Sequence, residues 1–564
     1  MADLGWQMSQ QAAPRGGRSG FFGDQMLLGL VAAFIVVVVA YPVVNSLRAI
    51  QLDQFSALLT PQNLIAIRNT AVAAILTIPP SLLIAVPMAW LCTRTNMPWR
   101  GPIIALVGTS FVMPMLFTTI AYVMLFGKNA GLINLVFADI LGGPLYDIYS
   151  FSGVVFIAVL QCFPLIFFTT ASGLGKVNPE LEEAARVAGL SSLQVFMRVT
   201  LGVTTPSIMA GVAFSFATAV TMLSGPLILA VPIGMPFLTS EMYAAIVWQT
   251  NIPRAVALSL PLLLTTLAAL WVQSWLVRDE GARFATVSGK GARSEAIDLG
   301  HWRVPALVLC LAIISISLFL PFLVLLAAGL MQFWWKGFVA SNFTLEHFVN
   351  LLGSSTMRLA IWNSVVLSFG TAAFLALFGT AAAIVLGGRQ TLLKQSVRML
   401  GLLPLGIAHV IAGVMVILAW YGYPFELGST IWLLGLGYVL VMLPYAVKTT
   451  EAGLGQIDLS LADAARICGC SPLSTWRHIL FPLMRSSIFT TFVLVFLFCI
   501  KEFPMTALIY SADTMTLAVR VYSLFESGSF EQCGAAAVLL LGLAFVALFV
   551  GSRVFKLSIS AIKV

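Results

Sequence analysis

The stretch Asn178–Gly202, NPELEEAARVAGLSSLQVFMRVTLG, decides the fold because the chain repeats its pattern in Asp458–Pro482, DLSLADAARICGCSPLSTWRHILFP. The register that pairs Gly173 with Gly453 runs through both copies without a gap. A shift of one residue would lose every match, so the two stretches indicate an internal duplication. The register pairs Glu183 with Asp463, Ala184 with Ala464, Ala185 with Ala465, Arg186 with Arg466 and Gly189 with Gly469.

Each copy is typical of a short helix in a polar gap between hydrophobic runs. Asn178 and Asp458 are suited to cap the N-termini, and Pro179 suits the first helical position. Gly189 and Gly469 are suited to end the helices. About ten residues make a rod of ~15 Å, which is too short to cross a membrane but fits a groove on another protein. The predicted bounds are Pro179–Ala188 and Leu459–Cys468.

These residues resemble the EAA loop in the permeases of binding-protein-dependent ABC importers. That pattern has an acidic residue, two alanines, a glycine after three more residues, and then Ile-x-Leu-Pro. The second copy ends with Ile479 and Pro482, whereas the first copy has Gly202 in place of the proline. The resemblance implies the type I ABC importer fold, a separate ABC ATPase homodimer and an extracytoplasmic substrate-binding protein. It implies that the residues coupled to the ATPase are Glu183, Ala184, Ala185, Gly189, Asp463, Ala464, Ala465 and Gly469.

The composition excludes a soluble globular protein. Of 564 residues, 60% are hydrophobic and 9% are charged, with a mean hydropathy of +0.99, whereas charged residues make up ~25% of soluble domains. The net charge of +8 comes from Lys and Arg that are dispersed through short loops, which argues against nucleic-acid binding. The chain is therefore predicted to be a polytopic protein of the lipid bilayer.

Twelve apolar runs are long enough for a helix to cross a ~30 Å hydrocarbon core, which takes ~20 residues. We therefore predict an all-α fold with twelve transmembrane helices in two parallel six-helix repeats. The runs are 26–47, 66–91, 102–126, 151–171, 203–230, 253–277, 304–330, 360–387, 399–420, 429–447, 486–510 and 534–552.

The positive charges predict the orientation. With the N-terminus in the cytoplasm, 22 of the 30 Lys and Arg residues fall on the cytoplasmic side, as the positive-inside rule requires. Both termini and both short helices would then face the cytoplasm, in a multi-pass protein of the bacterial inner (plasma) membrane. Six spans lie on either side of a polar linker, which gives the halves the same orientation. The predicted organisation is a tail (1–25), a first half (26–277, core 66–277), the linker (278–303) and a second half (304–556, core 360–552).

A second pair of landmarks supports the duplication. Asn69-Thr70 opens the second span of the first half, and Asn363-Ser364 opens the second span of the second half. We therefore expect these two dipeptides to occupy equivalent places.

Several motifs are absent. No Gly-x4-Gly-Lys-[Ser/Thr] sequence occurs, so a separate protein would have to hydrolyse ATP. The four histidines are scattered, and the seven cysteines fall mostly in hydrophobic runs. Only Cys468 and Cys470 are close together, and they lack the second ligand pair of a zinc site. The sequence thus predicts no enzymatic activity, cofactor, metal site or disulfide.

Lys501 and Glu502 are the exception to the apolar character of the spans. An ionisable pair inside a membrane helix is costly and marks a functional site by default. Alternatively, the pair satisfies itself or a backbone carbonyl beside Pro504. The first half has Thr221 and Met222 at the corresponding positions, so any site here is asymmetric.

The surroundings of this pair resemble the fused ferric-iron importer permeases. KEFPMT (501–506) is similar to their Lys-Glu-Leu-Pro-x-Thr run, and TLAVRVY (516–522) to their Thr-Leu-Ala-x-Arg-x-Tyr run. Fe³⁺ prefers hard oxygen ligands, and Tyr510, Asp513 and Glu526 lie nearby in the sequence. Fused permeases also serve phosphonates, sugar phosphates, thiamine and polyamines, which stay open as alternatives. The resemblance implies a translocation path with Lys501, Glu502, Thr506, Arg520 and Tyr522.

The leading hypothesis is the permease of an ATP-driven ABC importer, with both membrane halves in one chain and ferric iron as substrate. The alternative from another class is an ion-coupled secondary transporter, which also uses two parallel repeats. It would need several intramembrane acids, and only Glu502 is found. A membrane enzyme would require a group of convergent polar residues, which the sequence does not offer.

Overall fold

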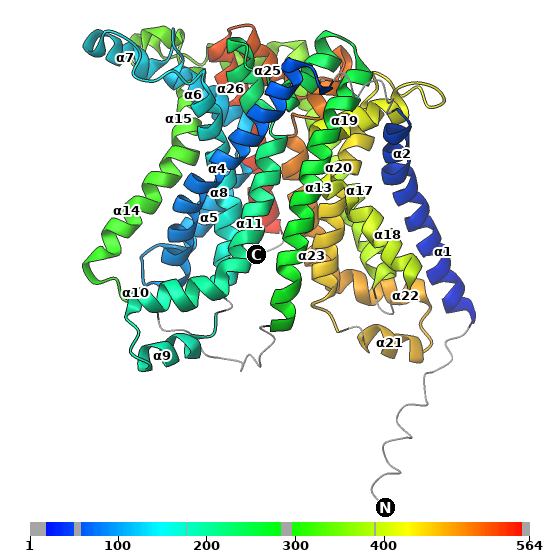
Figure 1. Cartoon of the computed structure of the whole chain (residues 1–564). Coiled ribbons are helices and arrows are strands. Elements are labelled where there is room, and N and C mark those ends of the chain that lie inside the picture. Colours follow the sequence, from blue (N-terminus) through cyan, green and yellow to red (C-terminus); the bar gives the residue numbers. More distant parts are fainter. Residues whose placement is uncertain are drawn as a thin grey trace, which may run out of the picture.

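The computed structural model describes residues 18–49, 58–175, 177–283, 296–387, 391–458 and 460–554. These residues form a helical bundle without a β-sheet, and extended pairing among them is limited to two isolated bridges. Figure 1 shows the long helices running side by side. The predicted tail and linker lie partly outside the described residues, which omit 1–17 and 284–295. The all-helical fold is confirmed for the part that is described.

Ten straight helical stretches in the described residues are long and apolar enough to cross a membrane, and three bent helix pairs bring the possible number to thirteen. The twelve predicted spans fall within this range. The straight stretches contain α1 (Arg18–Ile35) with α2 (Tyr41–Arg48), α4 (Pro61–Arg94), α8 (Phe151–Gly175), α11 (Leu201–Thr221), α13 (Ile252–Arg283), α14 (Arg303–Ile314) with α15 (Leu320–Leu330), α17 (Ser355–Leu386), α20 (Ile431–Leu454), α23 (Phe481–Ile500) and α26 (Phe530–Val554).

The bent pairs account for the differences from the predicted spans. α5 (Arg100–Val112) and α6 (Met115–Phe126) meet at 90°, and Leu392–Gly406 meets His409–Tyr421 at 112°. The runs 102–126 and 399–420 are therefore bent helices rather than straight ones. A third pair, Pro226–Ile233 with Leu238–Trp248, bends by 87°.

Two predicted spans are interrupted. The run 203–230 leaves the helix after Thr221 and is helical again in the π-helical turn Pro226–Ala230. The run 486–510 leaves the helix after Ile500 and is helical again in α24 (Thr506–Ile509). Pro226 opens the second segment of the first run, and Pro504 lies in the break of the second run, where a proline provides no N–H to continue the preceding helix. Hydrophobicity alone did not indicate these breaks, because the residues in and beyond them are also apolar.

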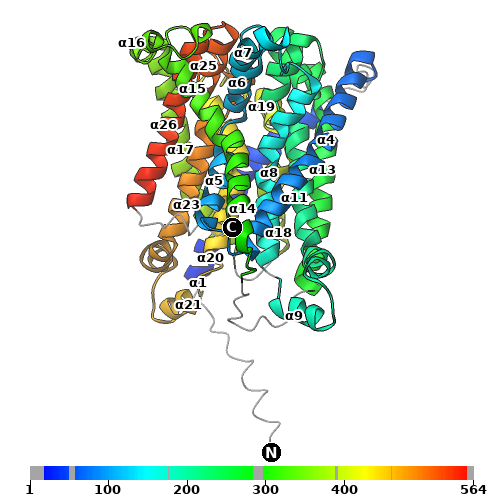
Figure 2. The same ribbon diagram turned by 90° about the vertical axis from the view of Figure 1, so that its left-hand side faces the viewer.

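The two short helices share one end of the bundle. α9 (Pro179–Val187) and α21 (Ser460–Ile467) lie there, and α7 (Leu132–Leu141) and α25 (Leu517–Glu526) lie at the opposite end. Figure 2 shows the same arrangement after a quarter turn. We call these the α9–α21 end and the α7–α25 end. The shared orientation agrees with parallel repeats.

The first helices of the two halves cross over. α1 and α2 pack against α17, α18 (Leu392–Leu402) and α19 (His409–Val416) of the second half, whereas α14 and α15 pack against α5 and α6 of the first half. The ring centroids of Phe34 and Phe378 lie 4.4 Å apart, and the Tyr122 hydroxyl donates to the Ile316 carbonyl at 2.8 Å. The first helices of each half therefore pack against the other half. The sequence analysis divided the chain into two successive halves and did not predict this exchange.

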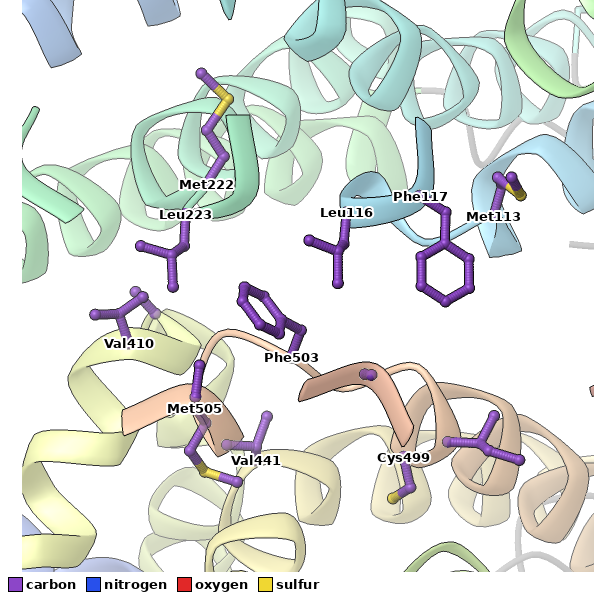
Figure 3. Packing of buried hydrophobic residues seen from close by; sticks show 14 of the residues in the cluster. Met113, Leu116, Phe117, Met222, Leu223, Val410, Val441, Cys499, Phe503 and Met505 are labelled. Carbon is purple, nitrogen blue, oxygen red and sulfur yellow. The ribbon is translucent and has the colours of Figure 1, made fainter. Parts of the chain in front are cut away.

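The halves also meet in an apolar interface near the middle of the bundle. Leu116 and Leu223 of the first half lie beside the Phe503 ring of the second half in Figure 3, and Met113 and Met505 belong to the same buried cluster. All of these side chains are buried, and Phe503 is only 2% exposed. We call Phe503 and the two leucines that it faces, Leu116 and Leu223, the apolar plug.

Candidate coupling helices and translocation path

The two short helices have the predicted caps and ends. The Asn178 side chain accepts a hydrogen bond from the Glu180 N–H at 3.1 Å, and the Asp458 carboxylate accepts one from the Ser460 N–H at 2.9 Å. Gly189 and Gly469 follow the helices with φ of +86° and +85°. This left-handed conformation disfavours any residue with a Cβ atom, so it explains both glycines.

α9 presents an exposed surface at its end of the bundle. Glu183 and Ala184 are exposed, and so are the apolar side chains of Leu181 and Val187, the latter at 89%. Ala185 is half-buried and faces the rest of the chain. A helix with this pattern can dock on another protein through its outer face while its inner face stays in contact with the bundle.

α21 repeats part of this pattern. Ala464 is exposed and Ala465 is buried, and Leu461 is 49% exposed. The side chain of Asp463 lies outside the described residues. The order of the elements after α21 nevertheless matches the order after α9. A four-residue helix follows in each half and then a π-helical turn, Phe196–Thr200 in the first half and Trp476–Leu480 in the second.

A buried ion pair holds α9. The Arg94 guanidinium at the end of α4 contacts the Glu182 carboxylate, which also accepts a hydrogen bond from the Thr200 hydroxyl at 2.6 Å. Burial alone would raise the pKa of Glu182. The hydrogen bonds from Arg94 and Thr200 and the positive charge of Arg94 have the larger effect together, so the pKa of Glu182 lies below its usual value. The ion pair therefore stays charged at neutral pH and fixes the helix to a membrane span.

The glycines that set the repeat register mark close helix crossings. A Cβ atom on Gly173 would lie 2.6 Å from the Cβ atom of Ser207, and one on Gly453 would lie 1.9 Å from Oγ of Ser487. In each half this contact joins the helix before the short helix to the helix after it. Only glycine allows so close an approach, which explains why both copies contain it.

Lys501 connects the second half to the first. Its ammonium group donates to the carbonyls of Phe111 at 3.2 Å and Val112 at 3.0 Å, which end α5. It also lies 5.5 Å from the ring centroid of Phe111 and 5.2 Å from that of Phe498. A cation is stabilised at a helix C-terminus, where carbonyl groups carry a partial negative charge. Lys501 thus bonds to backbone carbonyls at the bend between α5 and α6.

Glu502 holds the turn that follows. Its carboxylate accepts hydrogen bonds from the Met505 and Thr506 N–H groups, each at 3.0 Å, and from the Thr506 hydroxyl. It also lies 3.2 Å from Nδ1 of His409, at the bend of the second half. The Tyr438 hydroxyl completes the network 3.0 Å from the Thr506 hydroxyl. The loop that begins at Lys501 therefore reaches two of the three bent helix pairs, α5–α6 and the pair that contains His409. The contact with His409 was not predicted.

The landmark dipeptides do occupy equivalent places. The Asn69 side chain donates to the Pro236 carbonyl at 3.0 Å, and the Thr70 hydroxyl accepts from the Leu238 N–H at 3.0 Å. In the second half, the Asn363 side chain donates to the Asp513 and Met515 carbonyls, at 2.9 and 3.1 Å, and the Ser364 hydroxyl accepts from the Leu517 N–H at 2.7 Å. Each dipeptide thus holds the start of a short helix, α12 (Leu238–Tyr243) or α25.

The remaining residues of the predicted path lie farther from Lys501. The Tyr522 ring lies 5.1 Å from the Phe503 ring, and its hydroxyl donates to Glu526 at 2.7 Å. Arg520 is half-buried, and the described residues offer no hydrogen-bond acceptor to its Nε atom. The structure thus brings Glu502 and Thr506 together and links Tyr522 to them through Phe503. It also brings in Tyr243, which interacts with Tyr522 and was not predicted.

The chain forms a helical bundle of two parallel repeats, and each repeat has a capped short helix at the same end. This arrangement is typical of a membrane permease. The chain belongs to the family described as "Binding-protein-dependent transport system inner membrane component", whose model matches residues 68–280 and 379–559, more than half of the sequence. It is therefore a polytopic inner-membrane transport component of the ABC importer class, with two fused copies of the family domain, and not an enzyme.

The relatives differ in the substrates that their names give. PhnV of Salmonella typhimurium, named as a 2-aminoethylphosphonate transport system permease protein, is 26% identical over 45% of this chain and 95% of its own length. The ferric transport system permease protein FbpB of Actinobacillus pleuropneumoniae is 23% identical over 68% of this chain and 55% of its own length. The sulfate transport system permease protein CysT of Salmonella typhimurium is 29% identical over 34% of this chain and 70% of its own length.

Proposed function

We propose that this chain forms both membrane halves of an ATP-driven importer for ferric iron. The supporting observation is the duplicated pair of short helices at one end of the bundle. Two sites with the same backbone geometry suit the two identical subunits of an ATPase dimer. The proposal places the α9–α21 end and both termini in the cytoplasm, in agreement with the positive charges.

The transport mechanism follows from this arrangement. When the nucleotide-bound ATPase dimer closes, it would bring α9 and α21 closer together and rock the two halves about their interface. The apolar plug would then open toward one side and later toward the other, so that no covalent chemistry is required of the permease. A binding protein would deliver the substrate to the α7–α25 end.

Two features favour iron among the possible substrates. The alignment with the ferric permease FbpB spans 387 residues of this chain, more than a single half, whereas the alignment with PhnV spans 254. Tyrosine and carboxylate oxygens also gather at the α7–α25 end, where the substrate would enter. The second candidate is a phosphonate, because PhnV is a relative and Lys501 and Arg520 are cations.

Uptake by whole cells and by vesicles tests both parts of the proposal. Deletion of the gene should abolish uptake of radiolabelled ferric iron, with hexose phosphate and 2-aminoethylphosphonate as parallel substrates. Unchanged iron uptake together with loss of a phosphorylated compound would refute the iron assignment and leave the importer assignment intact. Loss of uptake after an uncoupler at constant ATP would instead favour the secondary transporter.

Charge reversal tests the coupling role. Glu183→Lys and Asp463→Lys should each abolish uptake while the protein remains in the membrane, because a reversed charge would oppose docking of the ATPase. Arg186→Lys keeps its charge and serves as the matched control. Wild-type uptake in both reversed variants would refute the assignment of α9 and α21.

A further inference from the structure

We propose that Tyr243 and Tyr522, one from each half, form with Tyr510 and Glu526 an oxygen-donor site that receives Fe(III) before it passes the apolar plug. This site rests on the proposed iron import and identifies where the imported ion first binds the permease.

The two tyrosines are equivalent residues of the two repeats. Asn69 and Thr70 hold the start of α12, and Asn363 and Ser364 hold the start of α25 in the same way. Tyr243 is the sixth residue of α12, and Tyr522 is the sixth residue of α25. The duplication therefore brings one phenol from each half toward the same place, where the two halves meet.

The phenols and a carboxylate form one cluster. Tyr243 lies close enough to Tyr522 for the two side chains to interact, and Glu526 lies near Tyr243, Tyr510 and Tyr522. The Tyr522 hydroxyl donates to the Glu526 carboxylate at 2.7 Å. Tyr243 and Tyr522 are 4% and 5% exposed, Tyr510 is half-buried and Glu526 is exposed. The carboxylate is thus the outermost group, and the two buried phenols lie behind it.

The cluster lies directly beside the plug. The Tyr522 ring is 5.1 Å from the Phe503 ring, and Phe503 faces Leu116 and Leu223 across the interface in Figure 3. The nearby pair of Arg254 and Glu241, at 2.7 Å, is neutral as a unit. An ion bound at the cluster would therefore lie next to the apolar plug, which must open for transport.

The donor set suits a hard trivalent cation. The phenolates of Tyr243 and Tyr522 and the carboxylate of Glu526 supply three negative charges, which balance Fe(III), while Tyr510 stays protonated and offers a neutral oxygen. Such oxygen ligands favour hard metal ions over soft ones. Binding is a ligand exchange in which iron stays Fe(III) and its previous ligand, water or citrate, leaves. Tyr243 and Tyr522 lose their protons to water, and the Glu526 carboxylate releases the Tyr522 hydroxyl. No oxidant or reductant is needed.

The experiment removes both phenol oxygens of the equivalent tyrosines in the purified full-length protein in nanodiscs. Fe(III)–citrate is added, and the visible charge-transfer absorption of an iron(III)–phenolate bond is recorded. Tyr243→Phe/Tyr522→Phe should lose this band and weaken iron binding at least about tenfold, as the loss of metal-site partners typically does. Tyr421→Phe, which removes a half-exposed phenol outside the cluster, should change neither.

Two further measurements, iron uptake and ATPase activity, distinguish a failure of the proposed site from a failure of the proposed iron import. Iron uptake by the complete transporter should fall in the double variant, while ATPase activity stimulated by the binding protein should persist. If the wild type imports iron and the double variant binds and imports it equally well, the site is refuted and iron import stands. If the wild type imports a phosphonate and no iron, both proposals fail, and Arg520 becomes the residue to test.

Discussion

The two halves of the permease carry the same short helix but hold it differently. In the first half, the buried Arg94–Glu182 pair fixes α9 to the end of α4. In the second half, the residue that corresponds to Glu182 is Ala462, and the ion pair of that region, Arg398 with Glu451 at 2.9 Å, joins α18 to α20 instead. The duplication has kept the helix, its cap and its final glycine. It has not kept the ion pair that anchors α9 to α4, because Ala462 cannot replace Glu182.

The loops that follow α11 and α23, at the interface between the halves, also differ, but here the charged residues lie in the second half. The second half has the charged Lys501 and Glu502, with hydrogen bonds to two of the three bent helix pairs, whereas the first half has Thr221 and Met222. There the Thr239 hydroxyl donates to the Met222 carbonyl at 2.7 Å. Each half therefore has one element that is held by charged side chains, the short helix α9 in the first half and the loop at Lys501 and Glu502 in the second.

The largest expected effect concerns the feature that the halves share. Gly189→Pro and Gly469→Pro should each abolish transport, because proline fixes φ near −65° and the observed values are +86° and +85°. The milder Gly189→Ala and Gly469→Ala changes cost about 1–2 kcal/mol each and should retain part of the activity. Uptake is measured at equal amounts of protein in the membrane. If only one proline variant were inactive, the two helices would not be equivalent.

The second prediction concerns the interface loop. Glu502→Gln should lower the stability of the purified protein by about 2–3 kcal/mol, because an amide donor would then face the N–H donors of the turn. Thr239→Val, which removes the hydrogen bond to the Met222 carbonyl in the corresponding loop, should cost only about 1 kcal/mol. Thermal unfolding in nanodiscs measures both changes. Equal losses would contradict the asymmetry of the two loops.

The sequence predicted the features that depend on local chemistry. The caps at Asn178 and Asp458, the two glycines and the equivalent dipeptides all follow from neighbouring residues or from the repeat, and the structure confirms them. The crossing of α1 and α14 to the opposite halves and the contact of His409 with Glu502 could not be predicted. They join residues far apart in the chain, and hydrophobicity reports that a helix is apolar without reporting its neighbour.

The third prediction tests the anchor of α9. Glu182→Gln should loosen α9 by about 1–2 kcal/mol, since it removes a charged hydrogen bond, and should leave α21 unchanged. A nitroxide on Ala188→Cys reports on α9, and one on the exposed Cys468 reports on α21, in variants that lack the other exposed cysteines. Label mobility should rise only at position 188. A rise at both positions would indicate general destabilisation instead.

The same label tests the ionisation of the anchor. The pKa of Glu182 is lowered in the folded protein, so the ion pair contributes stability above the usual value of 4.5, and this contribution is lost as the pH falls through the lowered pKa. Acidification should therefore loosen α9 in the wild type. In Glu182→Gln, the mobility at position 188 should already be high and should change little with pH.

The smallest expected effect separates the two caps. Hydrogen bonds from the Ser460 backbone and side chain lower the pKa of Asp458, so its charged cap is complete above the usual value of 3.8 and is lost as the pH falls through the lowered pKa. Asp458→Asn gives the second half the uncharged cap that Asn178 already provides in the first, and asparagine caps about as well as aspartate. A nitroxide on Cys468 should show little change at neutral pH in Asp458→Asn but greater mobility in Asp458→Ala. On acidification the wild-type label should become more mobile while the Asp458→Asn label should not, because its cap carries no proton-sensitive group. An equal response of the two would mean that acid acts on α21 through another group and that the caps of the two halves are interchangeable.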